Sequence, residues 1–477
     1  MRSAIAALLA LFLAAPLSPA RKWTSANGAR SFEADLIDSK DGKVTVRRSD
    51  GRTLTFALDL LSKADREFVA EASKTPAVPA APAGGVGNDW PRFRGPDIND
   101  HSPDTGLLKT WPAGGPERVW LYRDAGVGYA GPSIAGGKLF TMGARDAVVS
   151  LICLDAATGD ELWTAEVGAF YRNNWGDGPR STPTVDGDRV YALGAKGNLL
   201  CASISDGEKI WEINLKKDFD GGIPGWGYCE SVLIDGDNVI CTPGGGKGAI
   251  LALDKMTGTK LWQSTTLTDG AQYSSLIPIE HDGKRQYVQL FQKTLAGVSA
   301  TDGELLWRSN WGGRTAVVPT PIHKDGKVYI ASGYGVGCKL VKLGANGSAD
   351  DVWQNDVIVN HHGGVILVDD HLYGHSDNGG WKCQKFDTGE EVWKSGKLGK
   401  GAVHYADGML YCLEEKSGTV ALVEASTDGW NEKGRFTLKP QTELRKKDGR
   451  IWTHPVVVNG MLYLRDQDLI FCYKVKG

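Results

Sequence analysis

The chain has 477 residues, a net charge of −3 and 23% charged residues. This length exceeds one ordinary compact domain but suits a closed repeat architecture. The balance of charge excludes the strongly basic surface typical of nucleic-acid binding and the acidic composition of a solvating tail.

Residues 1–20 have the pattern of a signal peptide. Arg2 precedes an apolar run from Ala4 to Ala15, and the small residues Ser18 and Ala20 stand before a predicted cleavage site. The run is shorter than the roughly 20 residues of a membrane-spanning helix. We therefore expect an exported protein, periplasmic or extracellular, that begins at Arg21 and has no membrane span.

Residues 21–73 are predicted to form a small β-barrel. Short alternating strands, "SFEADLIDS", "KVTVRRS" and "RTLTFALDLL", are followed by a helix, "SKADREFVAEA", with Ser62 as its N-cap. Together with "KWTSANG" and "LSKADREFV", this pattern resembles the SH3-like homology domain first described in a yeast actin-patch protein. Residues 74–88 are rich in Pro, Ala and Gly, which predicts a linker.

From residue 89 to residue 477 a repeat predicts one all-β domain. Residues 181–215, "STPTVDGDRVYALGAKGNLLCASISDGEKIWEINL", contain four short strands joined by turns, which is one propeller blade. An Asp-Gly or Asn-Gly pair follows the first strand in six units, where a two-residue hairpin favours positive φ. These pairs are Asp186-Gly187, Asp235-Gly236, Asp282-Gly283, Asp325-Gly326, Asp407-Gly408 and Asn459-Gly460.

Each outer strand is expected to carry one tryptophan, so the number of these tryptophans indicates the number of blades. The tryptophans are Trp163, Trp211, Trp262, Trp307, Trp353 and Trp393. A seventh unit, residues 401–436, fits less well and has Phe436 at the tryptophan position. The last unit has only three strands, and the segment around Trp120 supplies the fourth, which would close the ring and leave no free sheet edges. We predict eight blades; the alternative is seven, with the seventh unit as an insertion.

Eight cysteines in an exported chain raise the alternative of a disulfide framework. Cys153, Cys201, Cys338 and Cys383 each lie six residues before a turn glycine, at equivalent positions of different blades. Such positions seldom approach to disulfide distance. The sequence favours buried thiols.

The recurring pattern Thr/Asp-Gly followed by tryptophan, as in "AATGDELW" and "DTGEEVW", resembles the tryptophan-docking motif of eight-bladed quinoprotein-type propellers. Longer strings, "DWPRFRGPDINDHSPDTGLLKTWPAGGPERVW" and "WGYCESVLIDGDNVICTPGG", resemble exported bacterial PQQ-binding-like β-propeller repeat proteins, some of them related to BamB. The resemblance implies tryptophans packed between blades. Quinoprotein alcohol dehydrogenases also carry an adjacent pair of cysteines, a tryptophan floor, Ca²⁺ and an aspartate base. No two cysteines of this sequence are adjacent, so PQQ with calcium is a minor alternative, and we expect no cofactor and no metal.

The candidate binding face consists of the loops that lead into the innermost strands, where aromatic and polar side chains concentrate. It comprises Trp175, Asp177, Arg180, Trp226, Glu230, Trp311, Arg314, His361, His362, Trp452 and His454. The structural alternative is a set of packed loop residues around a water-filled channel. His361-His362 as a metal site lacks a spaced third ligand, and residues 445–450, "RKKDGR", are predicted as a solvated loop instead of an anion site.

No catalytic motif appears, so catalytic residues are not assigned. The leading hypothesis is a non-enzymatic, BamB-like binding or scaffold module with a protein or glycan ligand on the propeller face. The alternatives are a PQQ-dependent dehydrogenase with a divergent site and a carbohydrate-binding propeller. The sequence leaves the ligand, the oligomeric state and the role of the N-terminal barrel open.

Overall fold

The computed structural model describes residues 21–27, 30–40, 42–48, 53–74 and 88–477. The chain divides into two compact units, Met1–Gly84 and Gly85–Gly477. The predicted signal peptide and nearly all of the predicted linker lie outside the described residues. Within the described residues, no helix is both long enough and apolar enough to cross a membrane.

The N-terminal unit is a four-stranded sheet with one helix. The strands β1 (Arg21–Thr24), β2 (Ser31–Lys40), β3 (Lys43–Arg48) and β4 (Thr53–Ala57) pair in chain order, followed by η1 (Leu58–Leu60) and α1 (Lys63–Lys74). Trp23 is fully buried in its core. The Oγ of Ser62 accepts a hydrogen bond from the backbone N–H of Asp65 at 3.2 Å, which caps α1.

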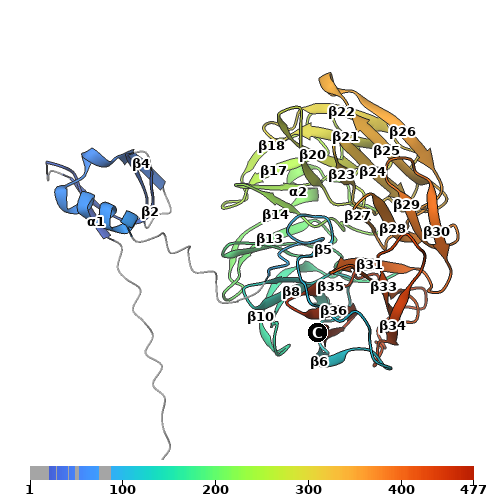
Figure 1. Ribbon diagram of the computed structural model, residues 1–477. Helices are drawn as coiled ribbons and strands as arrows, with labels where there is room; N and C mark the ends of the chain where they lie inside the picture. The colour runs from blue at the N-terminus through green and yellow to red at the C-terminus, as the bar shows by residue number, and fades with distance from the viewer. Residues whose placement is uncertain (1–20, 28–29, 41, 49–52, 75–87) are drawn as a thin grey trace, which may run out of the picture. The chain divides into compact units, whose positions relative to one another are not determined.

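The second unit is a propeller of eight four-stranded antiparallel blades (Figure 1). The innermost strands are β7 (Ser133–Ala135), β11 (Thr184–Asp186), β15 (Leu233–Asp235), β19 (Ile277–His281), β23 (Ile322–Lys324), β27 (Val365–Val368), β31 (Gly401–Ala406) and β35 (Val456–Val458). The second strands are β8 (Lys138–Arg145), β12 (Arg189–Leu193), β16 (Asn238–Cys241), β20 (Lys284–Leu290), β24 (Lys327–Ser332), β28 (His371–Ser376), β32 (Met409–Glu414) and β36 (Met461–Asp466). The third strands are β9 (Val148–Asp155), β13 (Asn198–Ser203), β17 (Leu251–Asp254), β21 (Thr294–Ser299), β25 (Gly337–Leu343), β29 (Gly380–Lys385), β33 (Thr419–Glu424) and β37 (Leu469–Lys474). The outermost strands are β10 (Glu161–Ala169), β14 (Lys209–Asn214), β18 (Lys260–Gln263), β22 (Leu305–Asn310), β26 (Ala349–Asn355), β30 (Glu391–Ser395), β34 (Glu432–Thr437) and β6 (Glu117–Tyr122). Two short helices, α2 (Leu215–Phe219) and η2 (Ala345–Gly347), lie in connections, and the prediction of eight blades is confirmed.

The hairpins between first and second strands have two forms. At Asp282-Gly283 and three equivalent pairs, both turn residues have positive φ, as a type I′ turn requires. At Asp186-Gly187 and Asp235-Gly236 the aspartate instead ends the inner strand, and the glycine, with φ of 59° in both, begins the turn. In one form the glycine is the second residue of the turn, and in the other it is the first. The same dipeptide fits both, because glycine accepts positive φ at either position.

The outer-strand tryptophans dock onto the next blade. Trp163, for example, donates its indole N–H to the carbonyl of Ile204 in the following blade at 3.3 Å. A Cβ added to Gly207 in that blade would lie 2.5 Å from the same ring, so only glycine leaves room for it. Five such tryptophan–glycine contacts join successive blades: Trp120–Gly159, Trp163–Gly207, Trp211–Gly258, Trp262–Gly303 and Trp353–Gly389. Trp307 differs, because its N–H is bound by Gln286 of its own blade.

The ring is joined at the eighth blade. β6 pairs antiparallel with β37, with Trp120 opposite Cys472. Phe436 of the seventh blade packs on Gly115, just before β6, where other blades have a tryptophan on a turn glycine. Arg465, fully buried, crosses from the eighth blade to the first and donates to the carbonyls of Ala130 and Met142 at 2.9 and 2.6 Å. Hydrogen bonds and packing therefore join the two ends of the domain.

A segment that precedes the first blade crosses the centre of the ring. Trp90 exchanges two backbone hydrogen bonds with Ile134 of β7. Arg92 donates to the carbonyl of Ile234 in β15, and Arg94 to that of Val365 in β27, each at 3.1 Å. The segment then adds β5 (His101–Ser102) in parallel to β31, and Figure 1 shows β5 inside the ring of blades. The chain thus spans its own central channel.

All eight cysteines belong to the described part of the chain, and all are free thiols. Seven are buried, and Cys229 is partly exposed. The expectation of buried thiols is therefore met at seven positions. No pair of cysteines crosslinks the described blades.

Candidate functional site

A central cavity of about 300 Å³ lies inside the ring, on the side of the loops that lead into the innermost strands. Seven of the eleven residues of the predicted binding face line it: Trp175, Arg180, Trp226, His361, His362, Trp452 and His454. They come from the loops before the second, third, sixth and eighth blades. Because equivalent loops of the blades face the same central space, side chains that are far apart in sequence meet there.

The other four predicted residues do not line the cavity. Trp311 is buried in the core between the fourth and fifth blades, where its N–H bonds the Oγ of Ser332 at 3.0 Å. Glu230 is buried behind the wall, and Arg314 is exposed. Asp177 accepts hydrogen bonds from Lys446 and from the backbone of Asn173, both at 2.8 Å, and so secures a loop at the rim.

The crossing segment forms the floor of the cavity. Trp90, Phe93, Arg94 and Asp100 line it, and Trp90, Arg94 and Asp100 are at most 3% exposed. By contrast, Trp175 is 49% exposed, which places the mouth on the loop side. A second cavity of about 630 Å³ shares Arg94 and is lined by the opposite ends of the same inner strands. The segment therefore divides the channel into two separate chambers.

Aromatic rings cover much of the first cavity's wall. Trp226 stacks on Tyr273 with centroids 4.8 Å apart, and it lies nearly parallel to His361 across 6.3 Å. Trp452 contacts Tyr129 at 4.9 Å. Arg180 lies over the ring of Tyr129 at 5.6 Å. These rings offer flat apolar platforms at several orientations.

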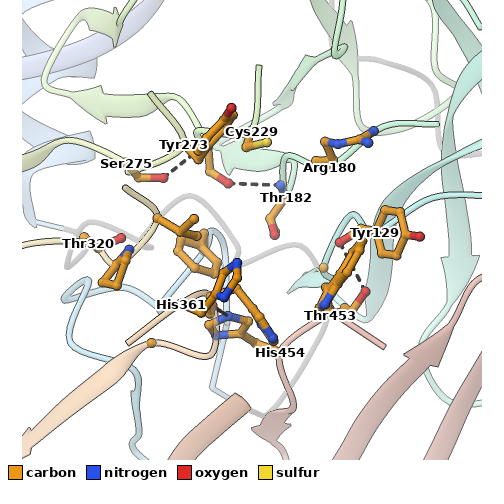
Figure 2. Close-up of a pocket in the computed structure, with 18 of the residues that line it drawn as sticks. Tyr129, Arg180, Thr182, Cys229, Tyr273, Ser275, Thr320, His361, Thr453 and His454 are labelled. Atoms are coloured by element: carbon orange, nitrogen blue, oxygen red, sulfur yellow. Dashed lines mark hydrogen bonds between the residues drawn. The ribbon is translucent and has the colours of Figure 1, made fainter. Parts of the chain in front are cut away.

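The imidazole of His361 contacts the ion pair formed by Lys400 and Asp377. The ammonium of Lys400 contacts the Nδ1 of His361 and a carboxylate oxygen of Asp377, both at 2.7 Å. Burial alone would raise the pKa of Asp377, but its contacts with His361 and Lys400 lower it. The same Nδ1 of His361 lies 3.4 Å from the other carboxylate oxygen of Asp377, so it has both an ammonium and a carboxylate beside it. Figure 2 shows His361 beside the open space of the cavity.

The other histidines of the wall are bound by protein groups. His362 and Trp452 both donate to the carboxylate of Glu415. The Nε2 of His454 donates to the carbonyl of His362 at 2.9 Å. Burial lowers the pKa of His362, and it lowers that of His454 to about 4. His454 is therefore neutral at ordinary pH.

Beneath the floor, His404 bonds Asp100 through Nδ1 at 2.8 Å and accepts from the backbone of Val457 at 3.2 Å. Both nitrogens of this buried histidine are thus used by the fold. Burial would raise the pKa of Asp100, but His404 and Arg94 keep it lowered. This pair supports the floor, with Asp100 at the cavity lining and His404 buried beneath it.

Several wall residues were missed from the sequence: Tyr129, Thr182, Cys229, Ser231, Tyr273, Ser275, Thr320, Tyr334, Lys400, Glu415, Arg450 and Thr453. One signal was available, because Thr182, Ser231, Ser275, Thr320 and Thr453 each stand two to three residues before an innermost strand. Several of their hydroxyls join blades: Ser231 accepts from the backbone of Thr182, and Ser275 from that of Ser231, both at 3.0 Å. Figure 2 labels several of these hydroxyls around the open space.

The cavity does not fit the quinone centre that the resemblance implies. Its one thiol is Cys229, so no pair of adjacent sulfurs can cover a cofactor. The wall carboxylates Asp100 and Glu415 are each bound to a histidine. Across the described residues, no group of three or more His, Cys, Asp or Glu side chains is arranged to hold a metal ion. His361 and His362 likewise lie at 63° to each other.

Comparison with known proteins agrees with this fold. Residues 110–216 and 145–395 match the family model described as Outer membrane protein assembly factor BamB, which spans more than half of the chain. The chain belongs to this family. Residues 14–76 match SLA1 homology domain 1, SHD1. Both resemblances drawn from the sequence are thereby confirmed.

A curated member of the BamB family, the Outer membrane protein assembly factor BamB of Xanthomonas campestris pv. campestris, is 25% identical over 189 residues. The match covers 38% of this chain and 41% of that protein, so the chain spans less than half of the relative's length. Its function therefore does not transfer directly to this chain.

Solved structures share the fold at low identity. The BamB structure from Moraxella catarrhalis has a TM-score of 0.52 and 16% identity, covering 75% of this chain and 97% of that one. Quinohemoprotein alcohol dehydrogenase from Comamonas testosteroni has a TM-score of 0.56 and 12% identity, covering 82% and 81%. A protein of the assembly-factor family and an enzyme thus share one architecture, and function has to be argued from the site.

Proposed function

We propose that this chain is an exported, non-enzymatic binding module that takes its ligand into the central cavity. The observation that carries the proposal is a chamber with a floor built by the chain itself and a wall of aromatic rings from several blades. Such a concave, largely aromatic site with a few polar groups is the usual form of a ligand pocket. The signal peptide predicted for residues 1–20 supports a periplasmic or extracellular location.

The absence of catalytic activity is part of the proposal. A general acid or base needs a side chain that is free to exchange a proton with the ligand. Glu415 is bound by His362 and Trp452, His362 and His454 are each held through Nε2 while their buried Nδ1 atoms have no hydrogen-bond partner among the described residues, and the Nδ1 of His361 contacts Lys400. These contacts favour a rigid wall over a reactive one.

A protein partner on the same face is the second candidate. Trp175 and Tyr334 are 49% and 43% exposed at the mouth, and exposed aromatic residues are enriched in protein interfaces. The BamB relatives are named for outer membrane protein assembly. A partner of this kind would cover the mouth without filling the chamber.

The test is titration of the purified full chain with neutral and acidic oligosaccharides, peptides, and PQQ with Ca²⁺, followed by calorimetry. We expect saturable binding of a small ligand that weakens at least tenfold in Trp226→Ala. The control is Leu261→Ala on an outer strand, where the side chain is 50% exposed and far from the wall. Stoichiometric quinone binding with dye-linked alcohol oxidation would overturn the proposal, as would binding of peptides alone.

A further inference from the structure

Two positive charges of the cavity wall, those of Arg180 and Arg450, have no negative partner in the part of the chain that the structure describes, whereas most of the negative charges are paired. Arg180 lines the cavity and donates to the backbone carbonyls of Gly176 and Gly178, and Arg450 donates to those of Lys447 and Gly449. Neither arginine forms an ion pair with any carboxylate in the described ranges. Carbonyls fix the orientation of a guanidinium but leave its charge unneutralised, so both sites favour an anion.

The acidic groups of the wall are, with one exception, already engaged. Glu415 is bound by His362 and Trp452, and Asp100 is bound by His404 through one oxygen, while its other oxygen is buried without a hydrogen-bond partner in the described chain. Asp448 has no cation partner among the described residues, but it is exposed at the mouth. The deeper wall therefore presents more positive than negative charge to a ligand.

His361 adds a third polar group to this surface. Its Nδ1 contacts Lys400 and Asp377, which leaves Nε2 for a ligand. Arg180 and His361 both line the cavity, and Figure 2 shows them apart from each other around the open space. Donors around this space suit a ligand that carries acceptor oxygens, above all anionic ones.

Another part of the wall consists of hydroxyls. Thr182, Ser231, Ser275 and Thr320 come from four successive blades, the second to the fifth. A hydroxyl both donates and accepts, and so matches the hydroxyls of a ligand. A planar aromatic acid would leave this part of the wall facing a ring without hydrogen-bonding groups.

Pairs of aromatic rings form the remaining part of the cavity wall. The stacked pair of Trp226 and Tyr273 and the pair of Trp452 and Tyr129 present flat faces, on which the apolar face of a sugar ring packs. Trp175 and Tyr334 continue the aromatic surface to the mouth. A chamber of about 300 Å³ is at the lower end of small-molecule pockets, so an oligomer would extend outward over these two rings.

Resting on the proposed binding function, we infer that the ligand is an anionic saccharide, a sugar oligomer with carboxylate or sulfate groups. The anionic group binds between Arg180 and Arg450, the sugar rings pack on the tryptophans, and the sugar hydroxyls face the Ser and Thr side chains. Carboxylate and sulfate both accept paired hydrogen bonds from a guanidinium.

The experiment compares four probes on the full chain by calorimetry: trigalacturonate, its methyl ester, a sulfated galactose trimer and PQQ. We expect trigalacturonate or the sulfated trimer to bind at least tenfold more tightly than the uncharged ester, and which of the two binds better identifies the anion. The double variant Arg180→Gln, Arg450→Gln is expected to abolish that preference, so that the acid and the ester bind with equal affinity. The matched control is Lys447→Gln, an exposed cation of the same loop, which should change neither.

The outcomes separate the two proposals. Equal affinity for the acid and the ester in the natural chain would overturn the anionic class but leave a binding function in place. Binding of PQQ without any saccharide would overturn the saccharide class. If none of the four probes binds, the inference fails, whereas the proposed function fails only if the wider titration with neutral oligosaccharides and peptides also shows no binding. The comparison of acid with ester needs no variant, so it holds even if the double substitution prevents folding.

Discussion

Tryptophan serves two purposes in this propeller, at two distances from its axis. On the outer strands, Trp163 and its counterparts pack on a glycine of the next blade. Around the central cavity, Trp226 and Trp452 pack on the tyrosines Tyr273 and Tyr129, and Trp175 is half exposed. The outer residues are repeated and hold blades together, whereas the inner ones are not repeated and line a chamber. Position within the repeat, more than residue type, decides which purpose a tryptophan has.

The largest expected effect breaks the outer ring. Trp211 is 8% exposed, donates to the carbonyl of Lys255 at 3.0 Å and lies against Gly258. Trp211→Ala removes this contact and leaves a cavity between blades, so we expect a loss of about 3–5 kcal/mol in the free energy of unfolding. Urea denaturation followed by circular dichroism measures it.

Trp175→Ala is the matched comparison on the inner face. Its side chain is 49% exposed, and we expect a loss of no more than about 0.5 kcal/mol. If the two substitutions cost the same, the distinction between structural and wall tryptophans is wrong.

The inner and outer parts of the propeller also differ in buried ionisable groups, of which Glu230 behind the cavity wall is the example. Glu230 stands just behind the wall, accepts from the backbone of Thr242 and has no cation partner in the described chain. Burial raises its pKa from the ordinary 4.5 to about 7. The folded state therefore holds a proton that the unfolded state releases in this interval. Its contribution to stability is fully present below pH 4.5 and is lost as the pH rises through 7.

Glu230→Gln should remove this dependence. At pH 8 we expect the variant to be more stable than the natural chain by about 3 kcal/mol, since one pKa unit corresponds to about 1.4 kcal/mol. At pH 4 the two should be equal. Urea midpoints at both pH values measure this, and parallel pH profiles for the two proteins would contradict it.

The fold was predictable from the sequence because its determinants repeat. Asp-Gly or Asn-Gly pairs mark the first hairpin of six blades, spaced tryptophans mark the outer strands, and even the atypical Phe436 occupies a docking position on Gly115. The candidate site was predictable only in part. Trp226 and Trp311 both stand among glycines in loops before inner strands, yet one lines the cavity and the other lies in the core. That difference depends on neighbouring blades: Ser332 and Lys293 bind Trp311, whereas Tyr273 supports Trp226.

No sequence pattern predicted the segment that forms the floor of the central cavity. Trp90, Arg94 and Asp100 belong to a segment that follows no repeat, and the blade residues that they contact are 44 to 304 residues away. Nothing local in the sequence reveals that this segment crosses the ring. Contacts of this range follow from closing the propeller, and only the folded chain displays them.

A last pair of substitutions separates the contribution of the docked tryptophan from that of the turn that carries the glycine. Gly207 and Gly187 both have positive φ, 77° and 59°, so alanine at either position is strained by roughly 1 kcal/mol. Only at Gly207 does the added Cβ also meet a ring, that of Trp163 at 2.5 Å, whereas none lies within 4 Å at Gly187. We therefore expect Gly207→Ala to lose about 2 kcal/mol more than Gly187→Ala in urea denaturation. In the Trp163→Ala background this excess should vanish, because the ring that the methyl group meets is gone. If the excess persists there, the turn itself, and not the docked tryptophan, requires glycine.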